Sequence, residues 1–506
     1  MIGFERRADY NDNLFNTSLI GIRNELNNKQ IERIKRLKRN WNFYEGYHWE
    51  EIPEQDTPEL TVNYCRAFVD KFVSFELGKA FTMNMKPDIE KTIVTPDKRT
   101  LFQFLEDVWI DNNQYLFATE MGQMKSVTGE AWVQVRYFDP EELDDPYNEY
   151  PDGRIVVVLM NSSVVFPEFD PHEKGKLTSL TIMYTYEHAT RSSILGKLRR
   201  ETRVYKQVWT KDQCAIYDGK KEPEIIPNKY KIIPFIQIKN ISVAGRNEGR
   251  SDLEDTIPLN TEYNMKESNV SEIIDYHSAP VTVVYGAKIG NLEKGANKMW
   301  GGLAKDAKVE NLELKSDLGA STNYIKGLKL AMCEVTGIPE SVLGGAQSIS
   351  NTSGVALQYM NLPLVEKTRL KRMSTEDGLE RVNKLILLVA LSEGLITKPA
   401  TMSTRDFFFN EVKLPDTLPK DMLLELQQIQ QEMTMGLESR KGAMKRMGKE
   451  NIEQLIEEID EDMKENPEIY GKTGEEQSKL NSGFTNGETA VETVRKEMTG
   501  QNGGAQ

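Results

Sequence analysis

The stretch GIPESVLGGAQSISNTS, residues 337–353, decides how this chain is organised, because it separates two long helical patterns. Residues 321–335 predict a helix that ends at Gly337 and Pro339. The pattern that follows runs from residue 354 to about residue 393, which is longer than an ordinary globular helix. A loop of small residues between long helices is typical of a lid, a switch or a pore lining. The alternative is a surface connector, and the rest of the sequence must decide between them.

The composition places the chain in a broad class. Its 506 residues are enough for a large core and about three domain-sized units. No apolar run approaches the roughly 20 residues of a membrane span, and the N-terminal MIGFERRADYNDN lacks the apolar core of a secretion signal. Cys65, Cys214 and Cys333 are far apart and odd in number, so we expect buried, reduced thiols and no disulfide framework. We therefore predict an intracellular protein that has no contact with a membrane.

The charge of the chain limits how it can meet nucleic acid. Its net charge is -14, which argues against tight non-specific binding to DNA but is compatible with a channel that must not hold DNA. The charge is uneven, since residues 449–465 are strongly acidic whereas residues 33–39 contain five basic side chains, Arg33, Lys35, Arg36, Lys38 and Arg39. The simplest interpretation of both segments is a solvated helix face.

The N-terminal half predicts both helices and antiparallel strands. Helices are expected over residues 31–44, 63–77 and 101–129, the last broken at Asn112 and Asn113. A strand is expected over residues 81–85. Short strand patterns separated by turn residues follow from 131 to 238 and predict a meandering antiparallel sheet. The fold class is therefore α+β.

The C-terminal half predicts long helices. A helix begins near Pro258, and a compact stretch with two strand-like runs, 281–315, separates it from the helix before the loop. In the long segment after the loop, Pro363 should bend the helix because it removes one hydrogen bond. A short strand is expected over 406–414 and helices over 421–465, whereas 466–506 has the composition of a disordered tail.

The sequence carries no recognisable catalytic or metal-binding motif. The four histidines are scattered, and no Cys/His pair has the spacing of metal ligands. Residues 466–473, NPEIYGKT, have only part of a phosphate-binding loop and follow no predicted strand. We therefore expect no enzymatic activity, no cofactor and no metal site.

Five strings of the sequence resemble the portal proteins of tailed bacteriophages, in the branch typified by siphophages of Gram-positive hosts. They are WNFYEGYHW (41–49), NYCRAFVDKFVSFELGK (63–79), IIPFIQIKN (232–240), GRSDLEDTIPLNTEYNMKESN (249–269) and GIPESVLGG leading into SGVALQYM (337–360). They occur in the family's order, and the resemblance covers about residues 41–465.

The resemblance implies a portal fold with an α/β wing, a two-helix stem, a small α/β clip, a long kinked helix and an α-helical crown. The implied segments are a wing at 1–248 with a return strand at 400–418, stem helices at 249–278 and 318–336, a clip at 279–317, a tunnel loop at 337–353, the kinked helix at 354–395, a crown at 419–465 and a disordered tail at 466–506. Portal proteins form a ring, usually of twelve subunits, at one vertex of the capsid. Double-stranded DNA enters and leaves through the central tunnel of that ring.

The same resemblance implies partners and sites. The implied partners are the large terminase subunit, the head-completion or adaptor proteins, and the major capsid and scaffold proteins. The protein would be found in the virion, and in the host cytoplasm during assembly. A loop that faces moving DNA should be small, polar and uncharged, and Gln347, Ser348, Ser350, Asn351 and Thr352 meet that need, with Ile349 as a brace against a neighbour. In the clip segment, Lys288, Lys294, Lys298, Lys305 and Lys308 are candidates for contact with DNA or an acidic partner; surface solubility explains them as well.

Two other classes of protein compete with the portal interpretation. Another virion assembly or scaffold protein is disfavoured by the strand-rich region at 131–238 and by the lack of long heptad repeats. The second class is a metal-dependent nucleic-acid enzyme, which would bind its metal through clustered carboxylates. The sequence does not distinguish such a cluster from an ordinary acidic surface, so the discriminating test is metal-dependent cleavage of plasmid DNA.

Overall fold

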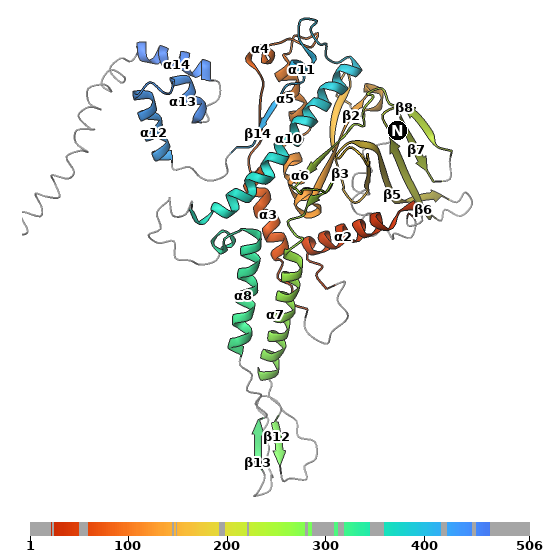
Figure 1. Ribbon diagram of the computed structural model, residues 1–506, viewed down its shortest axis with the longest axis vertical. Coiled ribbons are helices and arrows are strands. Elements are labelled where there is room, and N and C mark those ends of the chain that lie inside the picture. Colours follow the sequence, from red (N-terminus) through yellow and green to blue (C-terminus); the bar gives the residue numbers. More distant parts are fainter. Residues whose placement is uncertain are drawn as a thin grey trace, which may run out of the picture. The chain divides into compact units, whose positions relative to one another are not determined.

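The structure of the protein is a computed structural model (Figure 1). It describes residues 22, 25–49, 59–143, 146–147, 149–191, 198–219, 222–278, 282–285, 308–311, 318–344, 359–415, 422–447 and 452–465. The chain forms two compact units, residues 1–418 and 419–506. Helices and strands are both abundant, which confirms the α+β fold class. Within these described ranges, no helix combines the length and apolar character of a membrane span.

The helices of the N-terminal half begin and end where local side chains satisfy the backbone. They are α2 (Asn28–Glu45), α3 (Tyr64–Leu77), α4 (Pro87–Glu90), α5 (Leu101–Asp111) and α6 (Gln114–Thr128). At the start of α2, Asn27 and Gln30 exchange side-chain to backbone hydrogen bonds of 2.9 Å, which satisfies two free N–H groups. The helix ends at Gly46, whose φ of 99° suits glycine. The predicted helices at 31–44 and 63–77 and the broken hairpin at 101–129 are confirmed.

The strands form two main antiparallel sheets instead of the one meander that the sequence predicted. The first has the order β3-β2-β9, with β2 (Glu130–Phe138), β3 (Arg154–Met160) and β9 (Phe235–Lys239). The second runs in chain order through β4 (Val165–Phe169), β5 (Leu177–Arg191), β6 (Leu198–Trp209), β7 (Gln213–Asp218) and β8 (Glu224–Pro227). The single meander was wrong because β9 returns to pair with β2, so that Ala131 lies opposite Ile238, a long-range contact that turn spacing does not reveal.

Short elements lie between and after the strands of these sheets. They are the 3₁₀ turn η2 (Pro140–Glu142) and the small antiparallel pair β10 (Ile241–Ser242) and β11 (Gly249–Arg250). The next helix begins at Thr256, shortly after β11.

Two long helices pack side by side below the sheets, α7 (Thr256–Ser278) and α8 (Leu318–Thr336) (Figure 1). Pro258 lies in the first turn of α7, where a missing N–H costs nothing. Aromatic residues of α3, Phe68 and Phe72, share a buried cluster with Ile325 and Met332 of α8. Between the helices, β12 (Thr282–Tyr285) pairs antiparallel with β13 (Lys308–Asn311).

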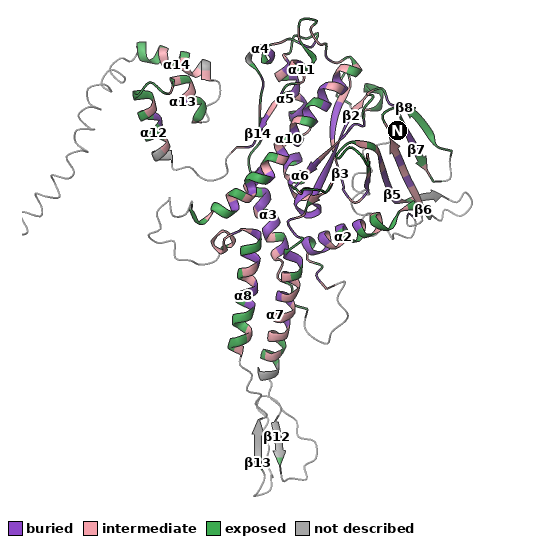
Figure 2. Cartoon of the chain, viewed as in Figure 1, coloured by how far each residue is buried: buried purple, intermediate pink, exposed green. Residues whose placement is uncertain are grey.

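The longest helix, α10 (Leu362–Glu393), passes across the three-stranded sheet and forms much of the main core. The predicted apolar stripe is confirmed, since Leu379, Val382, Leu385, Ile386 and Val389 are all buried. Figure 2 shows this burial along the part of α10 that crosses the sheet, whereas α7 and α8 each carry buried, half-buried and exposed residues.

The proline of the long segment lies in the first turn of α10 and does not bend that helix in its middle, contrary to the prediction from the sequence. Tyr359 and Met360 are helical, Asn361 is a turn residue, and α10 begins at Leu362 with Pro363 in its first turn. Pro363 has no N–H to offer to the preceding turn, so the helical path is interrupted just before it. Residues 354–358 of the predicted helix lie outside the described residues.

A strand pair joins distant ends of the first unit. β1 (Thr82–Asn84) pairs antiparallel with β14 (Glu411–Lys413), so that Met83 lies opposite Val412. The predicted strand at 406–414 was therefore too long: its first part belongs to α11 (Thr404–Phe407), which Ser403 caps by accepting a hydrogen bond from Asp406 N at 3.1 Å. The cap favours a helical turn there, and extended pairing begins only at Glu411.

The second unit is helical in its described part. It contains α12 (Met422–Thr434), α13 (Arg440–Arg446) and α14 (Ile452–Glu465), joined by an ion pair of 2.6 Å between Arg440 and Asp460. The acidic segment 449–465 largely coincides with α14, whose Glu457, Glu458 and Glu461 are exposed, as expected for a solvated face. The predicted disordered tail, 466–506, lies outside the described residues.

The cysteines agree with the sequence analysis. Cys65, Cys214 and Cys333 are free and buried. Burial raises the pKa of the Cys214 thiol to about 11, so this thiol stays protonated at neutral pH.

Candidate functional site

Most of the residues singled out from the sequence lie outside the described part of the chain. This holds for Gln347, Ser348, Ile349, Ser350, Asn351 and Thr352 of the predicted tunnel loop, and for Lys288, Lys294, Lys298 and Lys305. Lys308 is described, as the exposed first residue of β13 opposite Tyr285. The structure therefore describes the chain on either side of the loop, up to Gly344 and from Tyr359 onward, and we call these two segments its roots.

The first root of the loop follows α8 and is held tightly. Gly337 has a φ of +72°, and Ile338 is fully buried against the α3–α8 cluster. A 3₁₀ turn, η3 (Glu340–Leu343), follows, and Glu340 forms an ion pair of 2.5 Å with Lys329 of α8. The chain thus leaves α8 along a fixed path up to Gly344.

The second root, at the start of α10, lies beside the first. The Nζ of Lys367 donates a hydrogen bond of 3.1 Å to the carbonyl oxygen of Thr336, the last residue of α8. A Cβ on Gly337 would lie 3.5 Å from the carbonyl oxygen of Pro363, so the two backbones are in close proximity. The described chain segments on the two sides of the loop are therefore in contact with each other.

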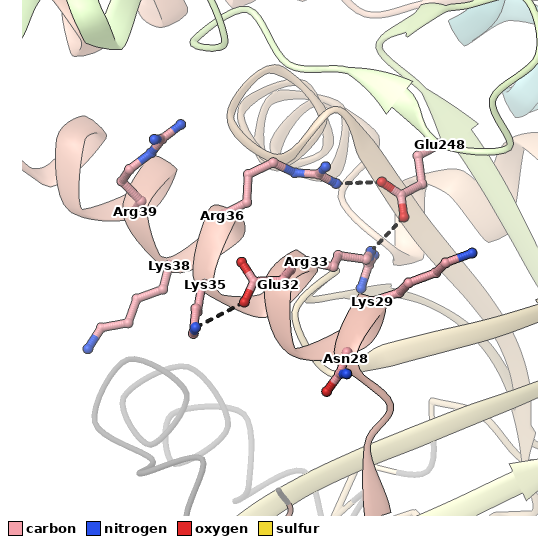
Figure 3. A pocket seen from close by; sticks show the side chains of 9 residues that line it. All are labelled: Asn28, Lys29, Glu32, Arg33, Lys35, Arg36, Lys38, Arg39 and Glu248. Carbon is pink, nitrogen blue, oxygen red and sulfur yellow. Dashed lines mark hydrogen bonds and ion pairs between the residues drawn. The ribbon is translucent and has the colours of Figure 1, made fainter.

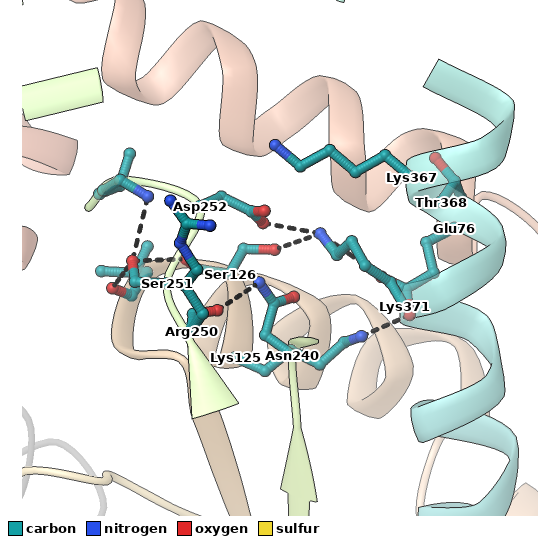
Figure 4. A network of polar contacts seen from close by, with 12 residues as sticks. Glu76, Lys125, Ser126, Asn240, Arg250, Ser251, Asp252, Lys367, Thr368 and Lys371 are labelled. Carbon is teal, nitrogen blue, oxygen red and sulfur yellow. Dashed lines mark hydrogen bonds and ion pairs between the residues drawn. The ribbon is translucent and has the colours of Figure 1, made fainter. Parts of the chain in front are cut away.

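A buried ionic network lies close to the second root (Figure 4). The Nζ of Lys371 in α10 contacts Asp252 at 2.7 Å and the Ser126 hydroxyl at 3.0 Å. The side chains of Lys371 and Asp252 have no exposed area. Lys371 thus joins α10 to the end of α6 and to the segment that leads into α7.

A second buried pair extends the network to α3. Lys125 of α6 donates to Glu76 of α3 and, at 2.7 Å, to the hydroxyl of Thr375 in α10. Lys371 lies 3.7 Å from the other oxygen of Glu76, which couples the two pairs. We call Glu76, Lys125, Asp252 and Lys371 the buried ionic network.

The electrostatics of the network follow from burial and pairing. Burial alone would raise the pKa of Glu76, but attraction to Lys125 and Lys371 outweighs it and holds this pKa below its usual value. The pKa of Asp252 is likewise raised by burial and lowered further by Lys371 and Lys367. Burial lowers the pKa of Lys125 to about 8, against the attraction of Glu76. Two carboxylates and two lysines share this interior site, so each charge depends on its partners.

Sequence analysis did not identify this network, although one signal was present. On α10, the buried positions Leu364, Thr368, Lys371, Thr375 and Leu379 recur every three or four residues. A lysine among such buried positions is unusual, because a buried ammonium group needs a partner. The partners themselves come from three other segments and could not be found from spacing.

The network is suited to fixing structure and not to chemistry on a substrate. Its charged groups have no exposed area, so no substrate reaches them. In the part of the chain that the structure describes, no group of three His, Cys, Asp or Glu side chains could hold a metal ion.

The described residues thus form two packed helices, a long helix over a three-stranded sheet and a buried ionic network that joins these elements. The sequence matches the protein family described as "Phage portal protein, SPP1 Gp6-like" over residues 23–468. This match covers most of the chain, and the protein therefore belongs to that family of phage portal proteins.

Solved structures give a weaker likeness. A chain from "Virion of native gene transfer agent (GTA) particle" has 11% sequence identity and a TM-score of 0.39, over 76% of this chain and 89% of that chain. A chain from "Neck of empty GTA particle computed with C6 symmetry" has 12% identity and a TM-score of 0.43, with the same coverage. No curated protein matches the sequence.

Proposed function

We propose that twelve copies of this protein form a closed ring at one capsid vertex, whose tunnel carries double-stranded DNA in during packaging and out during ejection. The observation that carries this proposal is membership of the portal family over residues 23–468. The segment roles follow: wing (1–248 and 400–418), stem helices (249–278 and 318–336), clip (279–317), tunnel loop (337–353), kinked helix (354–395), crown (419–465) and tail (466–506).

Exposed apolar side chains support assembly with neighbours. Leu362, Leu370 and Met373 recur at helical spacing in the first part of α10 and are 45%, 59% and 60% exposed, and Tyr359, just before that helix, is 72% exposed. We call these four residues the apolar stripe. Such a face on one copy is stabilised when the next copy covers it, and a repeated contact of this kind closes into a ring.

The tunnel loop would contact the DNA. Gln347, Ser348, Ser350, Asn351 and Thr352 are small or polar and uncharged, with Ile349 as a brace, so they can touch phosphates without holding them. The contact between the two roots would keep every copy of the loop at the same height in the tunnel. In an in vitro packaging assay, Gln347→Lys and Ser350→Lys should slow packaging and shorten the packaged DNA. Unchanged rate and length would remove the support for a low-friction loop.

The clip would serve as the docking platform for other proteins. We propose the large terminase subunit during packaging and head-completion or adaptor proteins afterwards, with Lys288, Lys294, Lys298, Lys305 and Lys308 as contacts to DNA or to an acidic partner. Glutamate substitutions at these lysines should weaken terminase binding. If binding and packaging do not change, the lysines only keep the surface soluble.

The role would be structural, in the virion and, during assembly, in the host cytoplasm next to major capsid and scaffold proteins. We propose no enzymatic activity. Incubation with plasmid DNA and Mg²⁺ or Mn²⁺ should leave the plasmid intact, whereas nicking by the pure protein would favour a nucleic-acid enzyme.

Negative-stain electron microscopy with a native mass tests the ring itself. Twelve chains of 57.8 kDa give a mass of about 694 kDa. We expect end-on rings with a central hole and twelvefold symmetry. Monomers or dimers that persist in the presence of scaffold and capsid protein would contradict the proposal.

A further inference from the structure

A groove on the first unit lies far in sequence from the loop and is not explained by a DNA conduit. One wall is α2, from which Lys29, Arg33, Arg36 and Arg39 face the groove at helical spacing. The other walls are β4, with Phe166, Pro167 and Phe169, and residues 246–254 around β11. The hollow measures about 700 Å³, and we call it the basic groove.

Some cations of the basic groove are already neutralised within the chain. Arg33 forms an ion pair of 2.6 Å with Glu130 and donates 3.1 Å to the carbonyl oxygen of Val165. Arg33 and Arg36 also converge on Glu248, as Figure 3 shows. Arg33 and Arg36 therefore already have carboxylate partners within the chain.

Other cations in the groove are not neutralised. In the described part of the chain, Lys29 and Arg39 have no carboxylate partner within ion-pair distance, and in Figure 3 both side chains end away from the others drawn. The Nε of Arg39 is buried and has no hydrogen-bond partner among the described residues. Lys29 and Arg39 can therefore pair with a carboxylate that comes from another molecule. Lys29 and Arg39 are ten residues apart on α2, or about 15 Å at the helical rise per residue.

The lining favours a polypeptide over DNA. Glu168, Glu248 and Glu254 line the basic groove together with its cations, and they would repel the continuous phosphate charge of a duplex. A peptide can place separate carboxylates against Lys29 and Arg39 and leave the glutamates to solvent. The half-buried Pro167 and Phe169 also offer apolar contacts, which suit side chains of a peptide and not phosphates.

We propose that the basic groove is a docking site for an acidic segment of a different protein, one that spreads its carboxylates over about 15 Å. The overall charge of -14 makes a basic surface on this chain an exception, and its complement is an acidic partner. The proposal goes beyond the DNA conduit, since it assigns a protein-docking surface remote in sequence from the tunnel loop.

The test measures fluorescence anisotropy of a labelled oligoglutamate peptide and of a labelled short DNA duplex with the full-length protein. The peptide should bind the wild type, more weakly as salt rises. The double variant Lys29→Glu/Arg39→Glu should bind it at least about tenfold more weakly, because two attractive contacts become repulsive. Carbodiimide coupling should then link a peptide carboxylate to Lys29, detected by mass spectrometry of the digested complex.

The matched control carries the same change of charge elsewhere. Lys91→Glu/Lys211→Glu reverses two exposed lysines outside the groove and should alter the affinity by less than about twofold. Equal loss in both double variants would overturn the proposal, since binding would then follow net charge alone. Tighter binding of the duplex than of the peptide at Lys29 and Arg39 would assign the groove to nucleic acid instead.

The native mass and the thermal unfolding of each variant distinguish a loss of peptide docking from a loss of ring assembly. If Lys29→Glu/Arg39→Glu keeps the mass and the unfolding temperature of the wild type, loss of the peptide reports on docking. If that variant loses its assembled mass and the wild-type assembly does not bind the peptide, the groove is a subunit interface and the proposal is wrong.

Discussion

Lys371 shows how much one residue of the buried ionic network matters. Its ammonium group has no exposed area and compensates Asp252 at 2.7 Å. Lys371→Met fills similar space but leaves a buried carboxylate without its cation, which we expect to lower the free energy of unfolding by about 3–5 kcal/mol. The measurement is the shift of the thermal and urea unfolding transitions relative to the wild type.

Two further variants serve as controls for the effect of Lys371→Met on stability. Lys413→Met, on an exposed lysine of β14, should leave the transition in place. The double variant Lys371→Met/Asp252→Leu should recover part of the loss, because it removes the uncompensated charge. A Lys371→Met transition equal to that of Lys413→Met would mean that the network contributes nothing.

The buried side chain of His48 predicts that the stability of the folded chain depends on pH. Its ring is buried between the Phe43 carbonyl oxygen, at 2.9 Å, and the Asn264 side chain of α7, at 2.7 Å. Burial lowers the pKa of His48 below its usual 6.5, so the unfolded chain binds more protons than the folded chain between the two pKa values. Stability should therefore fall as pH falls below 6.5.

The check is a pair of unfolding curves recorded over this pH range. The unfolding temperature of the wild type should fall between pH 7.5 and pH 5.5, and His48→Gln should remove the part of that slope which belongs to this histidine. Parallel slopes in the two proteins would show that His48 does not titrate differently on folding.

At the scale of elements, the packing of α10 on β9 depends on one glycine. A Cβ on Gly378 would lie only 2.7 Å and 2.9 Å from side-chain atoms of the fully buried Ile238. Gly378→Ala gains about 1 kcal/mol of helix propensity, but overpacking costs about 1–3 kcal/mol, so we expect a net loss of stability.

A double-mutant cycle isolates this contact. Ile238→Ala alone should destabilise by leaving a cavity, whereas adding Gly378→Ala to it should cost nothing or restore stability. Urea unfolding of the four proteins gives the coupling energy. Additive changes would mean that the helix shifts to accept the methyl group.

The elements were predicted to different extents for identifiable reasons. Helices such as α2 and α6 were predictable because Asn27 and Asn113 cap them and the apolar spacing is local. The division of the strands into two sheets was not predictable from the sequence, because it depends on the long-range pairing of Ala131 with Ile238. Likewise, the sequence showed Lys371 as a lysine among the positions of α10 that helical spacing buries, but its partner Asp252 could not be assigned from spacing.

At the scale of the whole molecule, the apolar stripe predicts assembly. Leu370→Glu/Met373→Glu puts two charges on a face that a neighbouring copy would cover, and we expect loss of the ring with little change in the stability of the single chain. Native mass spectrometry or light scattering measures the outcome. Lys91→Glu brings the same change of two charge units at an exposed site and should leave the rings intact. Rings formed equally well by both variants would exclude this face from the interface.

The ionic network also constrains the synthesis of the chain. Glu76 and Lys125 lie in the part made first, whereas Lys371 and Thr375 leave the ribosome about 250–300 residues later. At bacterial rates of translation, a delay of about 15–60 s separates the two events. During that interval the early segments cannot complete their core, because Asp252 and Glu76 still lack Lys371. A chain that ends before α10 lacks the cation that pairs with Asp252, so we expect that it cannot complete the buried ionic network.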